Sequence, residues 1–419
     1  MSDSKLKAPR GTFDVLGEEA SARSAIESRA RAILEGAGYE RIETPTFEAT
    51  ELFARGVGES TDIVRKEMFT FDDAAGRSLT LRPEGTAPVA RAYVEHGMHK
   101  RRQPVKLWYL SSFFRHERAQ AGRFRQFWQV GAEALGSEDP AVDAESILLL
   151  ATLLSELQVR DVRLRLASLG SAESRSEYRA HLQEHLRANA ERLSDDVRER
   201  IELNPLRAFD SEHPGTKAVM ESAPRLLDHL STADREHFAE VRALLDVASV
   251  PYELDTTLVR GLDYYTRTVF EFTSDALGAQ SGVGGGGRYD GLVKQLGGPP
   301  TPGMGWAAGL ERIMLAGEHR PTAPAPPELF LALEELTPEL RRTAFELLGE
   351  ARAAGLSAQM DLGERSLKGQ LGYAAALGAR YVAVIGVEQA TLKDTQDGGQ
   401  QTLAADAVVH AVLRAHSSL

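Results

Sequence analysis

Residues 113–129 read FFRHERAQAGRFRQFWQ, and four of the eleven residues from Arg115 to Arg125 are arginines. The chain as a whole is acidic, with a net charge of -12, so this local excess of guanidinium is not a by-product of composition. Arginine presents a rigid fork of donors that fits phosphate oxygens two at a time and stacks on flat rings. Arginines interleaved with aromatic residues therefore indicate a nucleotide or nucleic-acid site. The alternative is a charged hairpin on a solvated surface.

The bulk composition predicts a cytoplasmic enzyme of more than one domain. A length of 419 residues, 42% of them hydrophobic and 26% charged, is typical of a soluble chain with two or three domains. The lack of cysteine excludes disulfides, a thiol nucleophile, thiolate zinc sites and iron–sulfur clusters. Neither a bilayer-spanning apolar run nor the apolar core of a signal peptide is found, so no membrane contact is expected. A pI of about 5.5 argues against a sequence-blind binder of DNA or other polyanions.

Helical and strand-like patterns alternate over the first 320 residues. Residues 19–37 have helical spacing, and residues 172–248 are polar, helical and broken by prolines, which predicts an inserted helical module. Strand patterns return after it, so we expect an α+β fold, one large antiparallel sheet with helices against it. The expected strands are 39–43, 68–71, 79–81, 105–110, 124–130, 162–166, 252–259 and 266–272, and the other expected helices are 88–96, 142–157 and 307–316.

A proline-rich segment, 321–327 (PTAPAPP), predicts a semi-rigid linker and the clearest domain boundary. Beyond it, residues 328–419 change to a strand–helix–strand rhythm, which predicts a small α/β domain. The predicted order is strand 329–333, helix 338–354, strand 356–360, helix 366–377, strand 381–385, a hairpin turning at 397–399 and a last helix, 405–416.

The glycine run 282–287 (GVGGGG) formally matches the dinucleotide-binding pattern of three spaced glycines. That pattern needs a helix opening on the glycines and an acidic residue about twenty positions later, but position 307 is alanine. The chain also lacks a glycine–lysine–Ser/Thr phosphate loop, so arginine forks must do most of the work of holding any ATP. We interpret the glycines as allowing close approach of the backbone to a flat ligand.

Two further segments combine polar chemistry with turn or strand patterns. In residues 81–87 (LRPEGTA), Glu84 and Thr86 are two positions apart and face the same side, which suits an ammonium group; alternatively, Thr86 caps the helix that begins near Pro88. Residues 258–266 (LVRGLDYYT) place an arginine and two tyrosines where two strand patterns meet; alternatively, this is a hairpin with its tyrosines in the core.

Taken together, these segments closely resemble the histidyl-tRNA synthetase family of class II aminoacyl-tRNA synthetases, over essentially the whole chain. Three class motifs and two histidine-specific segments occur in order, and the sequence LVRGLDYY is specific to this family among class II enzymes. The resemblance implies a catalytic domain over 1–320, with the helical insertion at 172–248, and an anticodon-binding domain over 328–419 that contains Arg365 to Lys368. The matching segments are Ser21 to Pro45 for motif 1, Leu107 to Glu133 for motif 2, Leu258–Tyr265 and Gly284–Leu292 for the histidine-specific segments, and Gly303–Arg312 for motif 3.

The resemblance implies that histidine and ATP form histidyl-adenylate and pyrophosphate, and that the histidyl group then passes to the 3′ end of histidine tRNA. Arg115 would contact the α-phosphate and the histidine carboxylate, and Arg260 would reach the α-phosphate from the other side. Arg123 and Arg312 would hold the other phosphates and the adenine, with Glu117 also at the ATP site. Mg²⁺ would bridge the phosphates, and no ligand residue is assigned to it.

The resemblance also assigns residues to histidine and to tRNA. Arg118 and Gln120 match loop positions that recognise the extra 5′ guanosine of histidine tRNA, whereas Arg125 is expected to be a solvated strand residue. The chain departs from the family at Ala119, where proline is common, and at Trp128, where histidine is common; strand alternation points Trp128 away from Gln129. The expected histidine-binding residues are Glu84, Thr86 and Gln129 for the ammonium group and Glu133, Tyr264 and Tyr265 for the imidazole.

The main alternative function is that of a paralogue, the histidine-binding regulatory subunit of ATP phosphoribosyltransferase, which does not charge tRNA. That paralogue typically lacks the anticodon-binding domain and has a degraded arginine segment, whereas this chain keeps Arg260 and the domain from Leu329 to His416. The resemblance further implies a homodimer built across motif 1.

Overall fold

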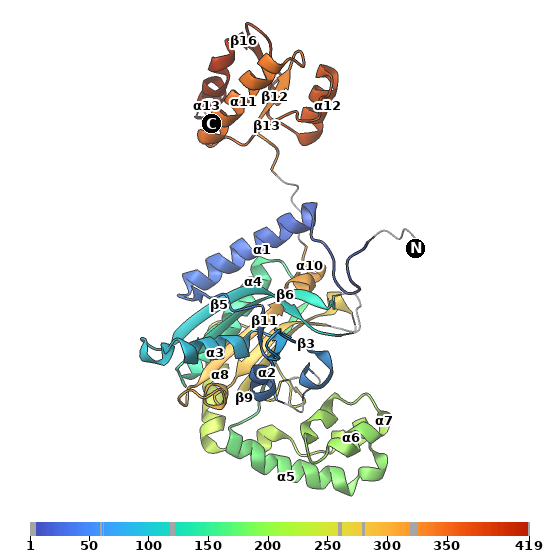
Figure 1. Ribbon diagram of the computed structural model, residues 1–419. Coiled ribbons are helices and arrows are strands. Elements are labelled where there is room, and N and C mark those ends of the chain that lie inside the picture. Colours follow the sequence, from blue (N-terminus) through green and yellow to red (C-terminus); the bar gives the residue numbers. More distant parts are fainter. Residues whose placement is uncertain are drawn as a thin grey trace, which may run out of the picture. The chain divides into compact units, whose positions relative to one another are not determined.

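The computed structural model describes residues 6–58, 61, 63–117, 122–258, 262–278, 281–318 and 325–417. The chain forms two compact units, Met1–Pro321 and Thr322–Leu419, which contain separate sheets (Figure 1). Within the described ranges, no helix combines the length and the apolar character needed to cross a membrane.

An eight-stranded sheet forms the centre of the first unit, in the order β1-β5-β6-β11-β10-β9-β7-β8. Its six inner strands are antiparallel to one another, while β1 on β5 and β8 on β7 are parallel. The predicted α+β class is confirmed, with parallel pairing only at the two edges of the sheet. The strands are β1 Glu40–Arg41, β5 Val105–Phe114, β6 Gln126–Leu135, β7 Val162–Ser168, β8 Glu253–Leu254, β9 Thr266–Ser274, β10 Gly282–Arg288 and β11 Gly303–Gly309.

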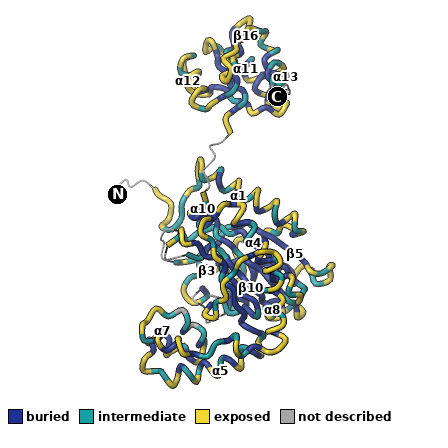
Figure 2. The backbone as a smooth tube through the Cα atoms, turned by 180° about the vertical axis from the view of Figure 1, so that it is seen from behind, coloured by how far each residue is buried: buried dark blue, intermediate teal, exposed yellow. Residues whose placement is uncertain are grey.

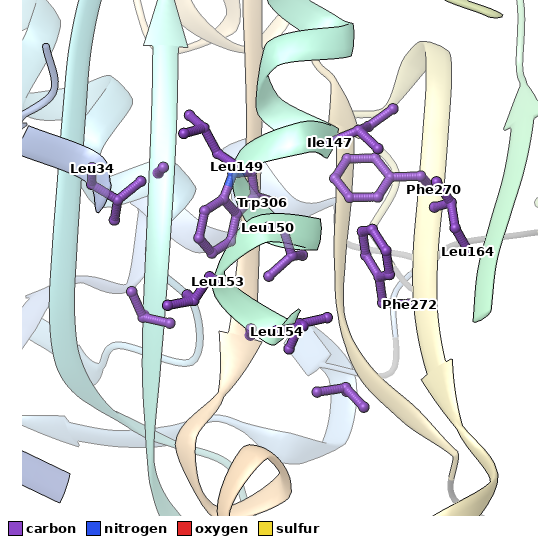
Figure 3. Packing of buried hydrophobic residues seen from close by; sticks show 14 of the residues in the cluster. Leu34, Ile147, Leu149, Leu150, Leu153, Leu154, Leu164, Phe270, Phe272 and Trp306 are labelled. Atoms are coloured by element: carbon purple, nitrogen blue, oxygen red, sulfur yellow. The ribbon is translucent and has the colours of Figure 1, made fainter. Parts of the chain in front are cut away.

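Helices cover one face of this sheet with an apolar core. Helix α4 (Pro140–Glu156) is apolar on most sides, as predicted, because it packs against the sheet and also contacts α1 (Gly17–Gly36) and α8 (Thr232–Val247). Figure 3 shows side chains of this helix, among them Ile147 and Leu150, beside aromatic residues of β9. Each fully buried aliphatic side chain contributes about 1.5–3 kcal/mol, so this layer is a major source of stability.

Strand alternation gives the two faces of the sheet different compositions. On β6, Val130 and Ala132 belong to the helix-covered core, so Gly131 and Glu133 point to the opposite face. On β11, Trp306 belongs to the core in the same way. The opposite face carries glycines and polar side chains beside a second apolar cluster, which includes Leu107 and Phe113 of β5, and a site can form there.

The β5–β6 hairpin is longer than its sequence pattern predicts. The strands pair in one continuous register from Val105 opposite Leu135 to Phe114 opposite Gln126. Serines 111 and 112 interrupt the apolar pattern, but they lie in the ladder opposite β6. Pairing with a neighbouring strand thus outweighs the weak strand preference of these residues.

The predicted helix 307–316 is wrong over its first three residues. Ala307–Gly309 end strand β11, and helix α10 begins at Leu310 and runs to Ala316. Alanine favours helix in isolation, but here the segment pairs with β10 on one side and β6 on the other. The neighbouring glycine run forms β10, and its pairing with β11 requires glycine at position 286, because a Cβ there would overlap the carbonyl oxygen of Gly305. A strand at this position excludes the helix-opening dinucleotide site.

Helices dominate the segment between β7 and β8, as predicted over 172–248. Figure 1 shows α5, α6 and α7 gathered on one side of the sheet, and α5 buries Tyr178, Leu182 and Leu186 against the turns that follow it. Of the predicted strand 252–259, only Glu253–Leu254 is a strand among the described residues. The helices of this segment are α5 Ala172–Ala188, α6 Asp195–Arg200, α7 Pro214–Glu221 and α8.

A small antiparallel sheet, β2-β4-β3, lies in the N-terminal part of the first unit. The segment 81–87 leads from β4 directly into α3, so it places Glu84 beside the start of a helix. Figure 2 shows buried backbone in strands such as β5 and β10, and many exposed positions along α5 and α7. The remaining elements of this unit are β2 Phe47–Ala49, α2 Thr50–Val57, β3 Phe69–Asp72, β4 Ser78–Leu81, α3 Thr86–Glu95 and α9 Leu292–Gln295.

Over its described residues, 325–417, the second unit is a five-stranded sheet, in the order β13-β12-β14-β15-β16, with the α-helices α11, α12 and α13. The predicted hairpin joins β15 and β16, and the other predicted elements agree with the structure within a few residues. These elements are β12 Leu329–Leu333, α11 Pro338–Ala353, β13 Ala358–Met360, α12 Leu367–Leu377, β14 Tyr381–Ile385, β15 Ala390–Asp394, β16 Gln400–Leu403 and α13 Val408–Ser417.

Candidate active site

A cavity of about 230 Å³ opens on the face of the large sheet that carries Gln129 and Glu133. Strands β6, β9, β10 and β11 supply Gln129, Glu271, Ala307 and several glycines to its lining. The segment after β5 and the first turn of α10 supply arginines. The lining residues are Arg115, Glu117, Gly122, Arg123, Phe124, Phe127, Gln129, Glu271, Gly282, Val283, Gly284, Gly285, Ala307, Gly309, Glu311 and Arg312.

Glu117 lies between two arginines of the cavity. Its carboxylate is 3.8 Å from Arg115 Nη1 and 3.2 Å from Arg123 Nη1. The Nε of Arg115 donates to the carbonyl oxygen of Pro83 at 2.9 Å, and its guanidinium lies 5.3 Å from the ring centre of Phe127. Arg115 is therefore held on two sides where it lines the cavity.

Arg312 brings a third guanidinium to the same cavity from α10. Its Nε donates to the carbonyl oxygen of Gly122 at 3.3 Å, and its Nη1 donates to that of Gly282. Burial first, and then repulsion from Arg123, lowers the pKa of Arg312. An anion bound in this cavity would relieve the electrostatic repulsion among the guanidiniums, so the cavity favours anion binding.

A buried polar cluster centred on Glu133 lies on the same face of the sheet. Glu133 is fully buried, and all its hydrogen bonds in the described residues come from hydroxyl groups. Thr86 Oγ1 donates at 2.8 Å, Tyr289 OH at 2.6 Å and Tyr109 OH at 3.4 Å. The carboxylate is thus oriented by uncharged donors.

Glu84 supplies a second buried carboxylate to this cluster. It accepts hydrogen bonds from the backbone N–H groups of Thr86 at 2.7 Å and Ala87 at 2.9 Å, at the start of α3. The hydroxyl of Tyr264 lies 3.5 Å from its Oε2. Glu84 therefore caps the helix, and the alternative that Thr86 is the N-cap is wrong; Gly85 occupies that position.

Burial makes ionisation of both carboxyl groups costly. It raises the pKa of Glu133 to about 8, against the opposing effect of its hydrogen bonds, and the nearby Glu84 raises that pKa further. Burial also raises the pKa of Glu84, and the Arg115 charge partly opposes that shift. A cationic ligand bound between these two acidic groups would stabilise their ionised forms and so lower the pKa of both.

Glycines make room for the large side chains of the cluster. A Cβ on Gly305 would overlap a Glu133 carboxylate oxygen, and one on Gly131 or Gly85 would overlap the ring of Tyr109. At these three positions, glycine therefore lets the backbone lie close to the protein's own side chains. Within the run 282–287, Gly282, Gly284 and Gly285 face the cavity itself.

The structure brings most of the residues predicted for the site into these two places. Arg115, Glu117, Arg123, Gln129 and Arg312 line the cavity. Glu84, Thr86, Glu133, Tyr264 and Tyr265 are buried together, and the two tyrosine rings are 4.8 Å apart. The tyrosines are also part of a hydrophobic core cluster, so packing and a polar contact coexist. Arg118, Ala119, Gln120 and Arg260 lie outside the described residues.

Of the predictions made for Arg125 and Trp128, both in the arginine tract, the first is wrong and the second is confirmed. The prediction that Arg125 is a solvated strand residue is wrong: it forms a bend before β6, its N–H donates to Gly11 O at 2.8 Å, and its side chain packs against Gly11. Trp128 packs on the helix-covered face, 4.5 Å from the guanidinium of Arg23, while Gln129 lines the cavity. The predicted separation of Trp128 from Gln129 is confirmed.

Sequence reasoning missed Tyr109, Tyr289 and Glu271. Tyr109 and Tyr289 are buried hydrogen-bond donors to Glu133, and Glu271 lines the cavity. In the sequence, Tyr109 cannot be distinguished from the apolar residues of the predicted strand 105–110. The signal for Glu271 is a single acidic residue in the otherwise apolar part of β9, VFEF.

Comparison with known proteins identifies the family of this chain. The family model described as "Histidyl-tRNA synthetase" matches residues 11–313. This chain belongs to the histidyl-tRNA synthetase family. A second model, "Anticodon binding domain", matches residues 330–415. The resemblance drawn from the class II motifs is therefore confirmed.

Relatives and solved structures match over nearly the whole chain. Histidine–tRNA ligase of Thermosynechococcus vestitus is 48% identical over 92% of this chain and 90% of its own length. Histidine–tRNA ligase of Halorhodospira halophila is 48% identical over 98% of both chains. The crystal structure of apo S. aureus histidyl-tRNA synthetase has a TM-score of 0.81 at 34% identity, covering 97% of this chain and all of that one. The synthetase fold thus includes both units of this chain.

Proposed function

We propose that this chain performs the histidine–tRNA ligase reaction by dividing its two substrates between the arginine cavity and the Glu133 cluster. L-Histidine and ATP would form histidyl-adenylate and pyrophosphate, and the histidyl group would pass to the 3′ end of histidine tRNA. The supporting observation is that both places lie on one face of the sheet and meet at Arg115. This arginine lines the cavity, binds the carbonyl oxygen of Pro83 and interacts electrostatically with Glu84.

The ATP phosphates would bind in the arginine cavity. Arg115, Arg123 and Arg312 offer forked donors to phosphate oxygens, and each charge-assisted hydrogen bond contributes about 1.5–3 kcal/mol. Glu117 would orient Arg115 and Arg123, because it already lies between them. Arg260, outside the described residues, is proposed to reach the α-phosphate from the other side.

The donors of the cavity also fit Mg²⁺, which would neutralise phosphate charge when bound. Mg²⁺ prefers oxygen ligands and is commonly held by one or two carboxylates together with substrate phosphates. Of the carboxylates that line the cavity, Glu311 accepts hydrogen bonds from Arg23 and from Trp128 N, and Glu117 lies between arginines. Glu271, the third carboxylate of the lining, is paired with Arg165 at 3.3 Å, so one or more of these three carboxylates would hold the metal together with phosphate oxygens, and no single ligand is assigned.

Histidine would bind at the Glu133 cluster. Its ammonium group would meet Glu84, Thr86 and Gln129, while Glu133, Tyr264 and Tyr265 would read the imidazole. A dry site with polar readers rejects an isosteric side chain by roughly 10⁴–10⁵, because the wrong ligand leaves buried polar groups without partners. The burial of Glu133 supplies that dry setting.

The adenylation step needs positioning and charge neutralisation. The histidine carboxylate already carries the charge with which it attacks the α-phosphate, so no side chain has to remove a proton from it. Arg115 would bring the carboxylate and the α-phosphate together while reducing the repulsion between them. Arg123 and Arg312 would stabilise the charge on the departing pyrophosphate.

Recognition of tRNA is proposed to involve both units. Arg118 and Gln120 would contact the extra 5′ guanosine of histidine tRNA, and the second unit, which contains Arg365 to Lys368, would bind the anticodon. We also propose that the chain works as a homodimer formed across motif 1 and acts in the cytoplasm. Sedimentation as a monomer at micromolar concentration would contradict the dimer.

Histidine-dependent exchange of pyrophosphate into ATP, followed by charging of histidine tRNA, tests this function. We expect both activities from the full chain. Folded protein without exchange would contradict the adenylation reaction. Exchange without charging would place the fault in the tRNA contacts. Histidine binding without exchange would support the regulatory paralogue as the alternative, although the match of residues 330–415 to an anticodon-binding model speaks against it.

A further inference from the structure

The segment that carries Tyr264 and Tyr265 is held by the helical module. Arg175, one turn into α5, donates through Nη1 to the carbonyl oxygen of Tyr265. On the same segment, the Nδ2 of Asn204 donates to Asp263 Oδ1 at 3.3 Å. Both contacts come from a part of the chain that supplies no residue to the arginine cavity or to the Glu133 cluster.

A second set of contacts between the helical module and β9 fixes the backbone just after the tyrosines. Arg267 has a φ of +45°, a conformation that side-chain-bearing residues rarely adopt. Its N–H donates to Gly170 O at 2.7 Å, and its carbonyl oxygen accepts from Leu169 N at 2.6 Å. Its Nε lies 3.2 Å from Asp234, which also accepts from Ser171 N at the start of α5. The module and β9 therefore meet at a defined geometry next to Tyr265.

The tyrosines transmit their position to both carboxylates of the cluster. The ring of Tyr264 lies 4.8 Å from that of Tyr265 and 5.8 Å from that of Tyr289. Tyr264 OH lies 3.5 Å from Glu84, and Tyr289 OH donates to Glu133 at 2.6 Å. A shift of the Tyr265 backbone would therefore change the donors that surround both carboxylates.

The surroundings of Arg175 favour an orienting role over a mainly stabilising one. A cavity of about 280 Å³ adjoins this part of α5, and Arg175, Arg179, Asn204 and Asp263 are among its lining residues. If the arginine were removed, water could enter this space and bind the Tyr265 carbonyl oxygen, so the fold would not keep a dry, unsatisfied acceptor. A water molecule would replace the hydrogen bond, but it would not hold the Tyr265 carbonyl oxygen in one fixed direction as the guanidinium does.

We propose that Arg175 is a positioning residue for histidine selection, which acts by holding the Tyr265 carbonyl oxygen and thereby orienting the tyrosines that read the imidazole. This proposal rests on the proposed function, because it assumes that histidine binds at the Glu133 cluster. It gives the helical module a part in amino-acid recognition through one side chain.

Steady-state pyrophosphate exchange by full-length Arg175→Met, with separate titrations of histidine and ATP, tests the proposal. We expect the KM for histidine to rise about 10- to 100-fold, the range for loss of a charge-assisted hydrogen bond, and the KM for ATP to stay within about twofold. Arg175→Lys, which can still donate to the carbonyl oxygen, should recover part of the histidine affinity. Arg179→Met is the matched control, because Arg179 on the same helix donates to Glu202 O at 2.9 Å and to Leu203 O, both inside the module.

Equal rises in both KM values, or the same effect from Arg179→Met, would overturn the proposal and leave Arg175 as general support for the module. A fall in kcat with an unchanged histidine KM would also overturn it. Thermal melting is measured alongside, and if Arg175→Met does not fold, Arg175→Lys decides: a histidine KM equal to that of the unmodified chain contradicts the proposal. Lack of exchange by the unmodified chain would instead contradict the proposed function.

Discussion

The arginine cavity and the Glu133 cluster lie on one face of one sheet, yet the first holds basic groups in partly open surroundings and the second holds acidic groups in buried ones. Arg115 and Arg123 keep 22% and 40% of their side-chain surface exposed and share a carboxylate partner. Glu133 is fully buried and bonded only to hydroxyl groups among the described residues. Arginine keeps its charge in almost any setting, so a polyphosphate can be bound in a partly open cavity. Reading a small aromatic ligand requires a dry site, which in turn makes the reader's own charge costly.

Replacing Arg115 would remove the link between the two places, and we expect the largest effect from this change. Arg115→Met should lower the rate of histidine-dependent pyrophosphate exchange by about 10²–10⁴, because two charge-assisted contacts of about 1.5–3 kcal/mol each are lost. Its melting temperature should stay close to that of the unmodified chain. Arg163→Met is the control, since Arg163 is 57% exposed and pairs with Asp275. Exchange within threefold of the unmodified chain would remove Arg115 from the mechanism.

Replacing Glu133 should separate the two places kinetically. Glu133→Gln keeps the size of the side chain but lacks the carboxylate, so we expect the KM for histidine to rise about 10- to 100-fold while the KM for ATP changes little. Separate titrations of the two substrates in pyrophosphate exchange measure this. A parallel rise of both KM values would show that the cluster supports the whole cavity and not histidine alone.

The raised pKa of Glu133 predicts that its burial costs stability as pH rises. Below about pH 4.5 the carboxyl group is protonated in both the folded and the unfolded chain, so it has no differential effect. Between that pH and about 8 the folded chain binds the extra proton, and the free energy of unfolding falls by at most about 1.4 kcal/mol per pH unit. Above about pH 8 the loss is complete.

Denaturant titrations between pH 5 and pH 8 check this prediction. The unmodified chain should lose stability relative to Glu133→Gln as pH rises across that window, by several kcal/mol at most. Glu335→Gln, a change at an exposed residue of the second unit, should follow the unmodified chain. A constant difference between the unmodified chain and Glu133→Gln at all pH values would show that Glu133 ionises as easily in the folded chain as in the unfolded one.

The smallest effect is expected at the exposed edge of the cavity. Arg123 is 40% exposed and lies against Glu117 in a setting that solvent screens. Arg123→Met should raise the KM for ATP about three- to tenfold and leave the KM for histidine unchanged. The salt dependence of the ATP KM should also weaken, because a screened cation has been removed. An effect as large as that of Arg115→Met would contradict the different roles given to the two arginines.

The sequence shows the ATP side of the site better than the histidine side. Arginines in a short tract stand out against an acidic chain, and strand alternation correctly separates Trp128 from Gln129. Tyr109 gives no such signal, because its role depends on the register that places it near Glu133 and on Gly131, which leaves room for its ring. Nothing in the local sequence encodes those long-range contacts.

Helix and strand boundaries show the same limit. Helix α4 and the second unit follow from periodicity, whereas Ala307–Gly309 form a strand only because β6 and β10 pair with them from both sides. Arg125 looks like a solvated residue until Gly11, more than a hundred positions earlier, packs against it. In each case a partner distant in sequence overrides the local preference.

The central claim is that the cavity and the cluster are two halves of one histidine-activating site. Pyrophosphate exchange into ATP by the full chain, measured with each of the twenty amino acids in turn, tests it most directly. The account predicts exchange with histidine and at least about 10⁴-fold lower efficiency with the others, as a dry polar reader requires. Equal exchange with several amino acids, or none with histidine by folded protein, would contradict it.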